Sequence, residues 1–225
     1  MPTGILYVVA TPIGNLDDIT LRALSILRSV DVILCEDTRV TAKLLQHYQI
    51  QRSLLSYHQH SDRRKTKEIQ ALLEEGKNLA LVTDAGTPGI SDPGNVLVAH
   101  LIGNPQIQII PIPGPSALIT ALSVSGLPTD KFLFLGFPPH KNKRQKFFKE
   151  VEQSSHTVVF YESGHRITRC LAELSALLHP NRQIVVCREL TKKFETIYRG
   201  TVAQLVAAAP DERGEFVVVV SPSAN

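Results

Sequence analysis

The first half of the chain repeats one unit: a short apolar run, a loop rich in glycine and proline, and then a helical pattern. The apolar runs cover residues 5–10, 32–35, 79–83 and 107–111, and residues 53–56 form a further candidate strand. Unbroken apolar strands that alternate with helices indicate a parallel sheet with helices on both faces. Because ligands of such sheets bind beyond the carboxyl ends of the strands, we expect the loops there to meet at one edge.

The second half has a different pattern. Strands are expected at residues 131–136, 157–161, 184–187, 195–198 and 215–220, with a basic helix after the first of them. Two strands in quick succession predict antiparallel pairs and therefore a mixed sheet with helices. The segment GLPTD at 126–130 is typical of a linker. We therefore predict an α/β protein with two domains, residues 1–126 and 127–225, which a chain of 225 residues can accommodate.

Composition excludes several classes of protein. Hydrophobic residues make up 43% and charged residues 20%, which predicts folded domains and excludes global disorder. Three widely spaced cysteines without a CxxC pair indicate neither a zinc site nor a disulfide framework, and free thiols suit a reducing compartment. No basic leader segment and no apolar run of about 20 residues is present, so we expect a cytoplasmic protein without a membrane span.

The loop DAGTPGISDPG at 84–94 is the strongest single indication of a ligand site. It holds three glycines and two prolines in eleven residues, whereas ordinary loops between a strand and a helix have about 2–6 residues. A purely structural turn is the alternative. The chain has neither the GxxxxGK[ST] nor the GxGxxG fingerprint, so a nucleotide phosphate or dinucleotide site is poorly supported. Asp84 and Asp92 supply acceptors at this edge, or serve only as turn formers.

Six motifs follow one another between residues 6 and 220. They are YVVATPIGNLDDITLRAL, EDTR, VTDAGTPGISDPG, PIPGPSA, YESGHR and RELTKKFE. In this order they resemble the tetrapyrrole-methylase-like superfamily, and most closely its branch that methylates a cytidine ribose 2′-oxygen in small-subunit ribosomal RNA. Two departures stand out: Gly164 replaces the proline of YESPHR, and relatives usually continue beyond GEFVVVV with a small helical tail. If such a tail helps to hold RNA, we expect it to affect the affinity for RNA more than the methyl transfer.

The resemblance implies S-adenosylmethionine as the cofactor, folded into a cleft between the two domains, and pairing of two subunits into a homodimer. A sulfonium cofactor has no phosphates, so backbone groups of glycine-rich turns can recognise it without a lysine. The residues expected at the cofactor are Pro12, Asp84, Thr87, Ile90, Ser116, Ala117, Tyr161 and Leu190.

Methyl transfer to an alcohol needs alignment of oxygen, methyl and sulfur, and removal of the hydroxyl proton. Candidate bases are Glu36, Asp37, Asp92 and Glu189, with Lys192 or Lys193 as a stabilising cation. We favour EDTR, in which Glu36 or Asp37 addresses the hydroxyl and Arg39 holds a phosphate of the substrate. The alternative is an internal carboxylate–arginine pair that only shapes the loop.

Two further segments are candidates for substrate binding. SYHQH at 56–60 offers His58 and His60, which we expect to face the substrate or the solvent and not a metal. The basic segment at 138–150 contains Lys143, Arg144 and Lys146, and RRKTK at 63–67 is also basic. Such patches give salt-sensitive contacts with an RNA backbone, although a solvated helix face with Phe147 and Phe148 in the core is the alternative.

The expected function is therefore S-adenosylmethionine-dependent 2′-O-methylation of a cytidine in small-subunit ribosomal RNA, a step of rRNA processing. One alternative is a tetrapyrrole C-methyltransferase acting on precorrin or uroporphyrinogen. Another is a non-catalytic, ribosome-associated RNA-binding protein, and an NTP- or NAD-binding enzyme is a distant third. Fold alone does not choose among them.

Overall fold

The computed structural model describes residues 2–58, 63–208 and 210–223. Contacts divide the chain into two compact units, Met1–Ser116 and Ala117–Asn225. This division falls earlier than the boundary after Gly126 that the sequence predicted. The difference is helix α5 (Ala117–Ser125), which packs on strands of the second unit. Each unit is described by itself below.

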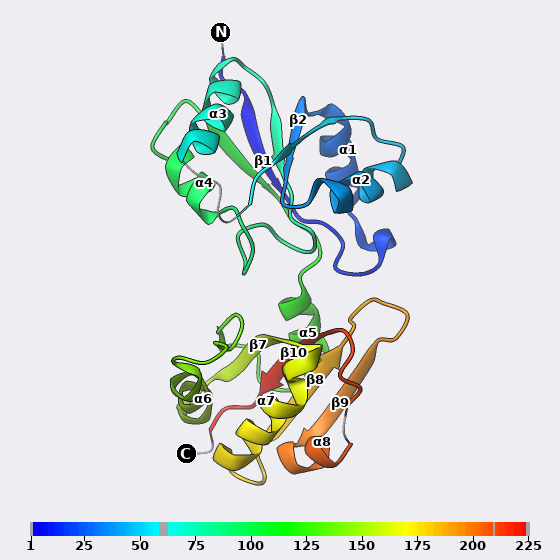
Figure 1. Ribbon diagram of the computed structural model, residues 1–225, viewed down its shortest axis with the longest axis vertical. Coiled ribbons are helices and arrows are strands. Elements are labelled where there is room, and N and C mark those ends of the chain that lie inside the picture. Colours follow the sequence, from blue (N-terminus) through cyan, green and yellow to red (C-terminus); the bar gives the residue numbers. More distant parts are fainter. Residues whose placement is uncertain (1, 59–62, 209, 224–225) are drawn as a thin grey trace. The chain divides into compact units, whose positions relative to one another are not determined.

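The sheet of the first unit is entirely parallel, as predicted (Figure 1). Its strand order is β3-β2-β4-β1-β5. The strands are β1 (Ile5–Val9), β2 (Val32–Cys35), β3 (Ser53–Ser56), β4 (Leu79–Leu81) and β5 (Gln108–Ile112). Since all five run in one direction, their carboxyl ends lie at the same edge of the sheet.

Helices cover both faces of this sheet, which explains why its strands are continuously apolar (Figure 1). Helices α1 (Leu21–Ser29) and α2 (Thr38–His47) lie on one face, and α3 (Arg63–Glu74) and α4 (Asn95–Leu101) on the other. The neighbours Ile33 and Leu34 show the consequence. Ile33 packs with α1 and α2, Leu34 packs with α3 and α4, and neither is exposed to solvent.

Local signals in the sequence account for several helix ends. Thr20 caps α1 by accepting a hydrogen bond from the backbone N–H of Ala23, at 3.1 Å. Gly76 lies beyond the end of α3, as predicted. Its φ of +88° is in the left-handed region that glycine readily adopts after a helix. Asp62, the predicted cap at the start of α3, lies outside the described residues. A 3₁₀ turn, η1 (Leu16–Asp18), follows the β1 loop.

The second unit contains the predicted mixed sheet, in the order β6-β7-β10-β8-β9. Strands β6 (Phe132–Phe134) and β7 (Thr157–Ser163) are parallel. The other pairs are antiparallel and involve β10 (Glu215–Val220), β8 (Gln183–Arg188) and β9 (Thr196–Thr201). Strands β7 and β8 flank β10 and run in the same direction, so their carboxyl ends lie at one edge.

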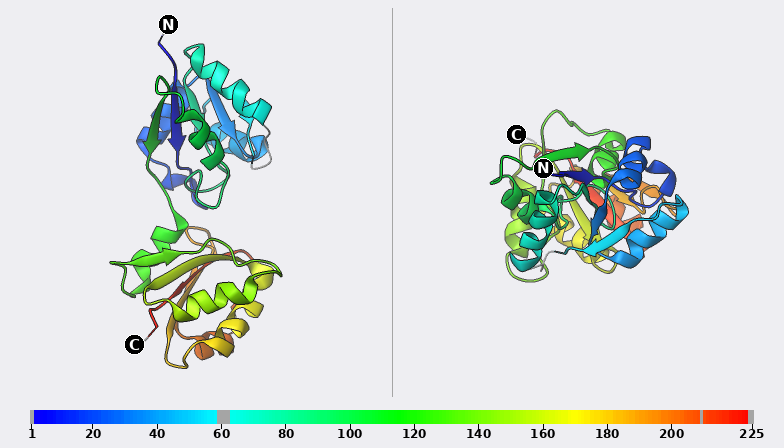
Figure 2. Two further views of the ribbon diagram at one scale, coloured as in Figure 1. Left: turned by 90° about the vertical axis from the view of Figure 1, so that its left-hand side faces the viewer. Right: turned by 90° about the horizontal axis from the view of Figure 1, so that it is seen from above.

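One face of this sheet carries the main core of the second unit. Helices α6 (Arg144–Gln153), α7 (Gly164–Leu177) and α8 (Val202–Ala208) pack there, around Phe148 and Phe160. Helix α5 contacts β7 and β10 on the opposite face (Figure 2). Among the described residues, no helix is both long enough and apolar enough to cross a membrane.

Candidate active site

Loops from different strands of the first unit meet at the carboxyl edge, as predicted. Thr11, after β1, exchanges two backbone hydrogen bonds with Gly86 at 2.9 and 3.1 Å. The backbone N–H of Asp37, after β2, donates to Asp84 Oδ1 at 3.2 Å. The hydroxyl of Thr87 donates to the carbonyl of Pro115, after β5, at 3.4 Å. The glycine-rich loop is thereby joined to the three neighbouring loops.

The glycine-rich loop has a backbone that side chains would disturb. Gly89 has φ +84°, and a Cβ there would lie 2.5 Å from Asn95 Oδ1. Gly86 has φ +79°, which lets its backbone pair with Thr11. The loop is therefore a fixed, backbone-lined turn at the edge where ligands of such sheets bind.

Asp37 and Arg39 form a local pair. Arg39 donates from Nε to Asp37 Oδ1 at 3.0 Å and from Nη2 to Oδ2 at 2.6 Å, and its backbone N–H donates to Oδ1 at 2.8 Å. The hydrogen bond from the Arg39 side chain is the main cause that lowers the pKa of Asp37 to about 2. The pair shapes the start of α2, as in the alternative interpretation. The catalytic assignment of Asp37 and Arg39 remains a prediction.

Glu36 has a different environment from its neighbour Asp37. Its side chain is half-buried. Burial raises the pKa of Glu36, and the charge of Asp84 raises it further, while His58 acts in the opposite direction. The ends of β2, β3 and β4 thus bring Glu36, His58 and Asp84 into one electrostatic cluster. His60, the second histidine of the predicted pair, lies outside the described residues.

A small pocket adjoins this cluster within the first unit. Its volume is about 260 Å³, which is slightly below the range that is usual for small-molecule sites, roughly 300–1,000 Å³. The pocket is lined by Thr11, Pro12, Leu16, Val40, Thr41, Lys43, Leu44, Thr83 and Asp84. Two predicted cofactor residues, Pro12 and Asp84, therefore lie together. The pocket is mostly apolar and has one carboxylate and one lysine on its wall.

The remaining predicted cofactor residues divide between the two units. In the first unit, Thr87 and Ile90 belong to the glycine-rich loop, and Ser116 follows β5. In the second unit, Ala117 begins α5, while Tyr161 and Leu190 lie near the shared carboxyl edge of β7 and β8. The ring of Tyr161 packs against Phe134 and Phe137, with centroids 5.1 and 5.3 Å away.

A buried ionic network behind Tyr161 was not predicted from the sequence. Glu162 is 1% exposed and contacts Arg166 Nε at 3.1 Å and Arg144 Nη2 at 3.5 Å. Arg144, 3% exposed, also contacts Glu173 at 2.8 Å. The backbone N–H of Ser163 donates to Glu162 at 2.9 Å. This network fixes the backbone of the YESGHR segment.

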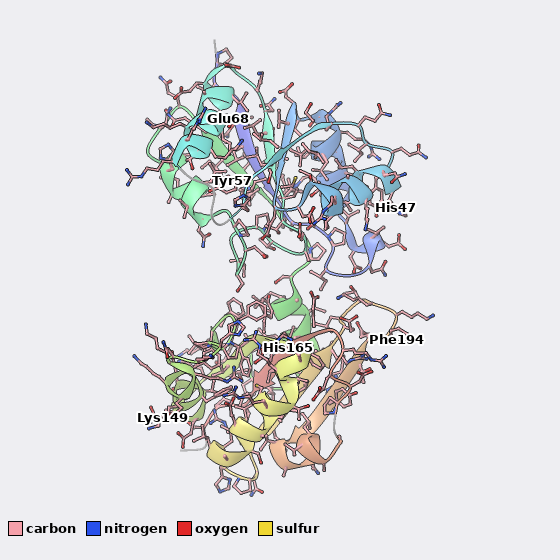
Figure 3. All side chains as sticks on the ribbon, in the orientation of Figure 1. His47, Tyr57, Glu68, Lys149, His165 and Phe194 are labelled. Carbon is pink, nitrogen blue, oxygen red and sulfur yellow. The ribbon has the colours of Figure 1, made fainter. Side chains whose placement is uncertain are left out.

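The network changes the interpretation of the basic segment. Arg144 was predicted to contact RNA, but its guanidinium is buried between Glu162 and Glu173 and serves the interior. Phe147 and Phe148 are core residues, as the alternative stated. Lys143 and Lys146 are exposed, and Lys149 also extends from the outer side of α6 (Figure 3).

The other acidic candidate is also engaged. Burial opposes ionisation of Glu189, but hydrogen bonds from Lys192 Nζ and the backbone N–H of Glu215 outweigh it, and the pKa of Glu189 is lowered. Lys192 also contacts Glu215 at 2.9 Å. Within the described part of the chain, no group of three His, Cys, Asp or Glu side chains is arranged to hold a metal ion.

The sequence matches the family model of the tetrapyrrole (corrin/porphyrin) methylases over residues 5–206. The chain belongs to this family. As a member of the tetrapyrrole methylases, it is a methyltransferase whose methyl donor is S-adenosylmethionine. The edge of the first unit fits such a cofactor, because it offers glycine-rich backbone, an apolar pocket and the carboxylate of Asp84.

Curated relatives within the tetrapyrrole methylases are close in sequence. A protein of Synechocystis named ribosomal RNA small subunit methyltransferase I is 49% identical over 97% of this chain and 79% of its own length. Proteins of the same name from Escherichia coli O157:H7 and Bacillus subtilis are 47% and 44% identical. They cover 96% and 99% of this chain, and 77% and 76% of their own lengths are matched.

Solved structures confirm the tetrapyrrole-methylase fold. The methyltransferase CobJ superposes with a TM-score of 0.71 at 20% identity, over 99% of this chain and 95% of its own. The uroporphyrin-III-C-methyltransferase of Thermus thermophilus gives a TM-score of 0.67 at 19% identity, over 97% and 94%. At this level of identity the similarity concerns the fold alone.

Proposed function

We propose that the protein transfers a methyl group from S-adenosylmethionine to the ribose 2′-oxygen of a cytidine in small-subunit ribosomal RNA. The observation that carries the proposal is the half-buried Glu36, with a raised pKa, beside Asp84 and His58 at the edge that also holds the glycine-rich loop. The relatives that are 44–49% identical bear the name of an rRNA methyltransferase, which supports RNA as the acceptor.

Glu36 would act as the general base. A ribose hydroxyl is a weak nucleophile while protonated, and a carboxylate with a raised pKa accepts its proton more readily than an ordinary one. The cofactor supplies an electrophilic methyl group. Pro12, Asp84, Thr87, Ile90 and Ser116 would hold it at the first unit, with its positive charge favoured by Asp84.

Asp37 and Arg39 would support this arrangement without taking the proton. The low pKa of Asp37 makes it a poor base, and its pairing with Arg39 keeps the EDTR turn in place. Ala117, Tyr161 and Leu190 remain cofactor contacts that the resemblance alone predicts.

RNA binding would use exposed basic residues and His58. Lys143 and Lys146 are solvent-exposed on and beside α6 and can contact phosphates. A 2′-hydroxyl acceptor also distinguishes RNA from DNA. We further propose that the enzyme acts in the cytoplasm, where the small subunit is assembled, and as a homodimer.

The test is transfer of labelled methyl groups to small ribosomal subunits from a strain that lacks the enzyme. We expect one labelled cytidine whose phosphodiester bond resists alkali. Glu36→Gln should abolish most transfer, whereas Glu75→Gln, which alters an exposed pair with Lys77, should not. Label in a base would refute methylation of the ribose oxygen. No label in RNA, together with transfer to uroporphyrinogen, would refute RNA as the acceptor and favour the tetrapyrrole alternative.

A further inference from the structure

The loop between β8 and β9 carries an exposed aromatic residue that the proposed methyl-transfer site does not use. This segment, residues 189–195, is called the β8–β9 loop here. Phe194 is 62% exposed, more than any other phenylalanine among the described residues. Its side chain lies at the end of the hairpin, away from the core of the sheet (Figure 3). Burial of the hydrophobic core does not account for a phenylalanine in this place.

The β8–β9 loop is firmly held at both of its ends. Arg188 donates to the carbonyl of Phe194 at 3.2 Å, to that of Arg213 at 2.8 Å and to Asp211 at 3.2 Å. On the other side, Lys192 bridges Glu189 and Glu215, at 2.9 Å each. The exposed aromatic ring is therefore presented by an ordered loop, which lowers the entropic cost of binding a partner.

The backbone of the loop is also strained. Glu189 and Thr191 have φ values of +51° and +67°, in the left-handed region that residues with a Cβ rarely adopt. Thr191 Oγ1 is buried, and it has no hydrogen-bond partner among the residues that the structure describes. Strain of this kind persists only where the surrounding contacts enforce it, and it is concentrated at functional sites. The loop maintains a costly conformation that displays residues 193 and 194.

The chemistry of the loop favours a single-stranded nucleic acid. Lys193 Nζ lies 5.6 Å from the centroid of the Phe194 ring, and Lys193 forms no ion pair within the described part of the chain. An aromatic face beside an ammonium group matches a base beside its phosphate. A protein partner would need a broader apolar patch, whereas the neighbours of Phe194 in the loop are Lys192, Lys193 and Glu195.

We propose that Phe194 stacks on an unpaired base of the RNA substrate and that Lys193 contacts an adjacent phosphate. This inference rests on the proposed function and deepens it. Phe194 belongs to none of the residue sets proposed for methyl transfer, and Lys193, a candidate stabilising cation in the sequence, is assigned to a phosphate instead. Unpaired bases are the usual targets of sequence-specific RNA recognition, since their faces and edges are accessible.

The absence of tryptophan from the chain provides a direct test. Phe194→Trp creates a protein with a single tryptophan, and stacking on a base should quench its fluorescence when a single-stranded RNA of about 12 nucleotides is added. Val206→Trp is the matched control. Val206 is 43% exposed on α8, which begins at the end of β9 opposite to the loop. The fluorescence of Val206→Trp should not change when the RNA is added.

A second measurement uses methylation of small ribosomal subunits. Phe194→Ala should raise KM about 5- to 150-fold with little change in kcat, whereas Phe194→Tyr should restore KM. Lys193→Ala should raise KM and reduce its dependence on salt. Because the side chains of Phe194 and Lys193 are both exposed, circular dichroism should show unchanged folding of all three variants.

The results that overturn the proposal are distinct from those that overturn the function. Stacking is refuted if single-stranded RNA does not quench the fluorescence of Phe194→Trp. It is also refuted if Phe194→Ala has an unchanged KM while the unaltered enzyme methylates RNA. Both results leave the proposed function intact. Quenching by a double-stranded RNA as strong as that by the single strand also refutes it. If the unaltered protein neither binds nor methylates RNA, the proposed function fails, and this contact fails with it.

Discussion

Glu162 is predicted to be the most sensitive charged position of the second unit. Its carboxylate is 1% exposed and lies between Arg166 at 3.1 Å and Arg144 at 3.5 Å. Glu162→Gln keeps the volume and can still accept hydrogen bonds, but it leaves the buried guanidinium of Arg144 and the half-buried one of Arg166 with Glu173 as the remaining carboxylate of the network. Removing one partner of a buried ion pair typically costs about 3–5 kcal/mol.

This cost can be converted into a melting temperature. For a unit of this size, about 1 kcal/mol shifts the melting temperature by roughly 4 °C, so Glu162→Gln should lower that of the second unit by more than about 10 °C. Thermal unfolding followed by hydrogen exchange at the β7 and β10 amides measures this unit separately. That separation matters because a chain with two units need not unfold in one step.

Two control variants test whether burial is the cause. Glu173→Gln removes a carboxylate whose side chain is 28% exposed, so the loss should be smaller. Glu75→Gln removes an exposed pair with Lys77 in the first unit, so it should leave the melting of the second unit unchanged. A Glu162→Gln protein that melts within about 3 °C of the unaltered one, or no further from it than Glu75→Gln, refutes the reasoning.

Three further predictions concern the site and the RNA surface. The pKa of Glu36 is raised, so its ionised form is lost as the pH falls through that raised value. The acid-side decline of kcat should therefore occur at a higher pH than the decline expected for a glutamate with an ordinary pKa. A pH–rate profile checks this. Gly89→Ala should weaken binding of S-adenosylmethionine at least tenfold by calorimetry, because its Cβ meets Asn95, whereas Gly126→Ala, at φ +72° with open space around it, should not. Reversing Lys143 and Lys146 to glutamate should weaken RNA binding and lower its salt dependence, and unchanged binding at physiological salt would contradict the assignment.

The sheets could be predicted because their signals are local. Unbroken apolar runs indicated the parallel sheet, and closely spaced strands indicated the mixed one. The association of α5 with the second unit could not be predicted in the same way. A loop and a helix after β5 look like one more repeat of the first unit, and only packing on β7 and β10 separates them.

The burial of Arg144 was indicated by the helical spacing of its neighbours, but the positive charge of the segment favoured a surface position. The buried residues of α6 are Arg144, Phe147, Phe148 and Val151, at positions i, i+3, i+4 and i+7 of one helical face. The charge of the segment suggested a surface, while this spacing placed the arginine in the core. Its partners Glu162 and Glu173 come from β7 and α7, and no local pattern identifies contacts between such distant segments.

The EDTR turn shows how far a motif can determine chemistry. Glu36 and Asp37 are adjacent carboxylates that sequence alone treats as equivalent candidates. In the structure their pKa values shift in opposite directions, because burial beside Asp84 acts on Glu36 while Arg39 stabilises the charge of Asp37. Carboxylates driven apart by their environments take different roles in acid–base chemistry. The motif therefore supplies one residue suited to accept a proton and one suited to hold the loop, and only the three-dimensional contacts tell which is which.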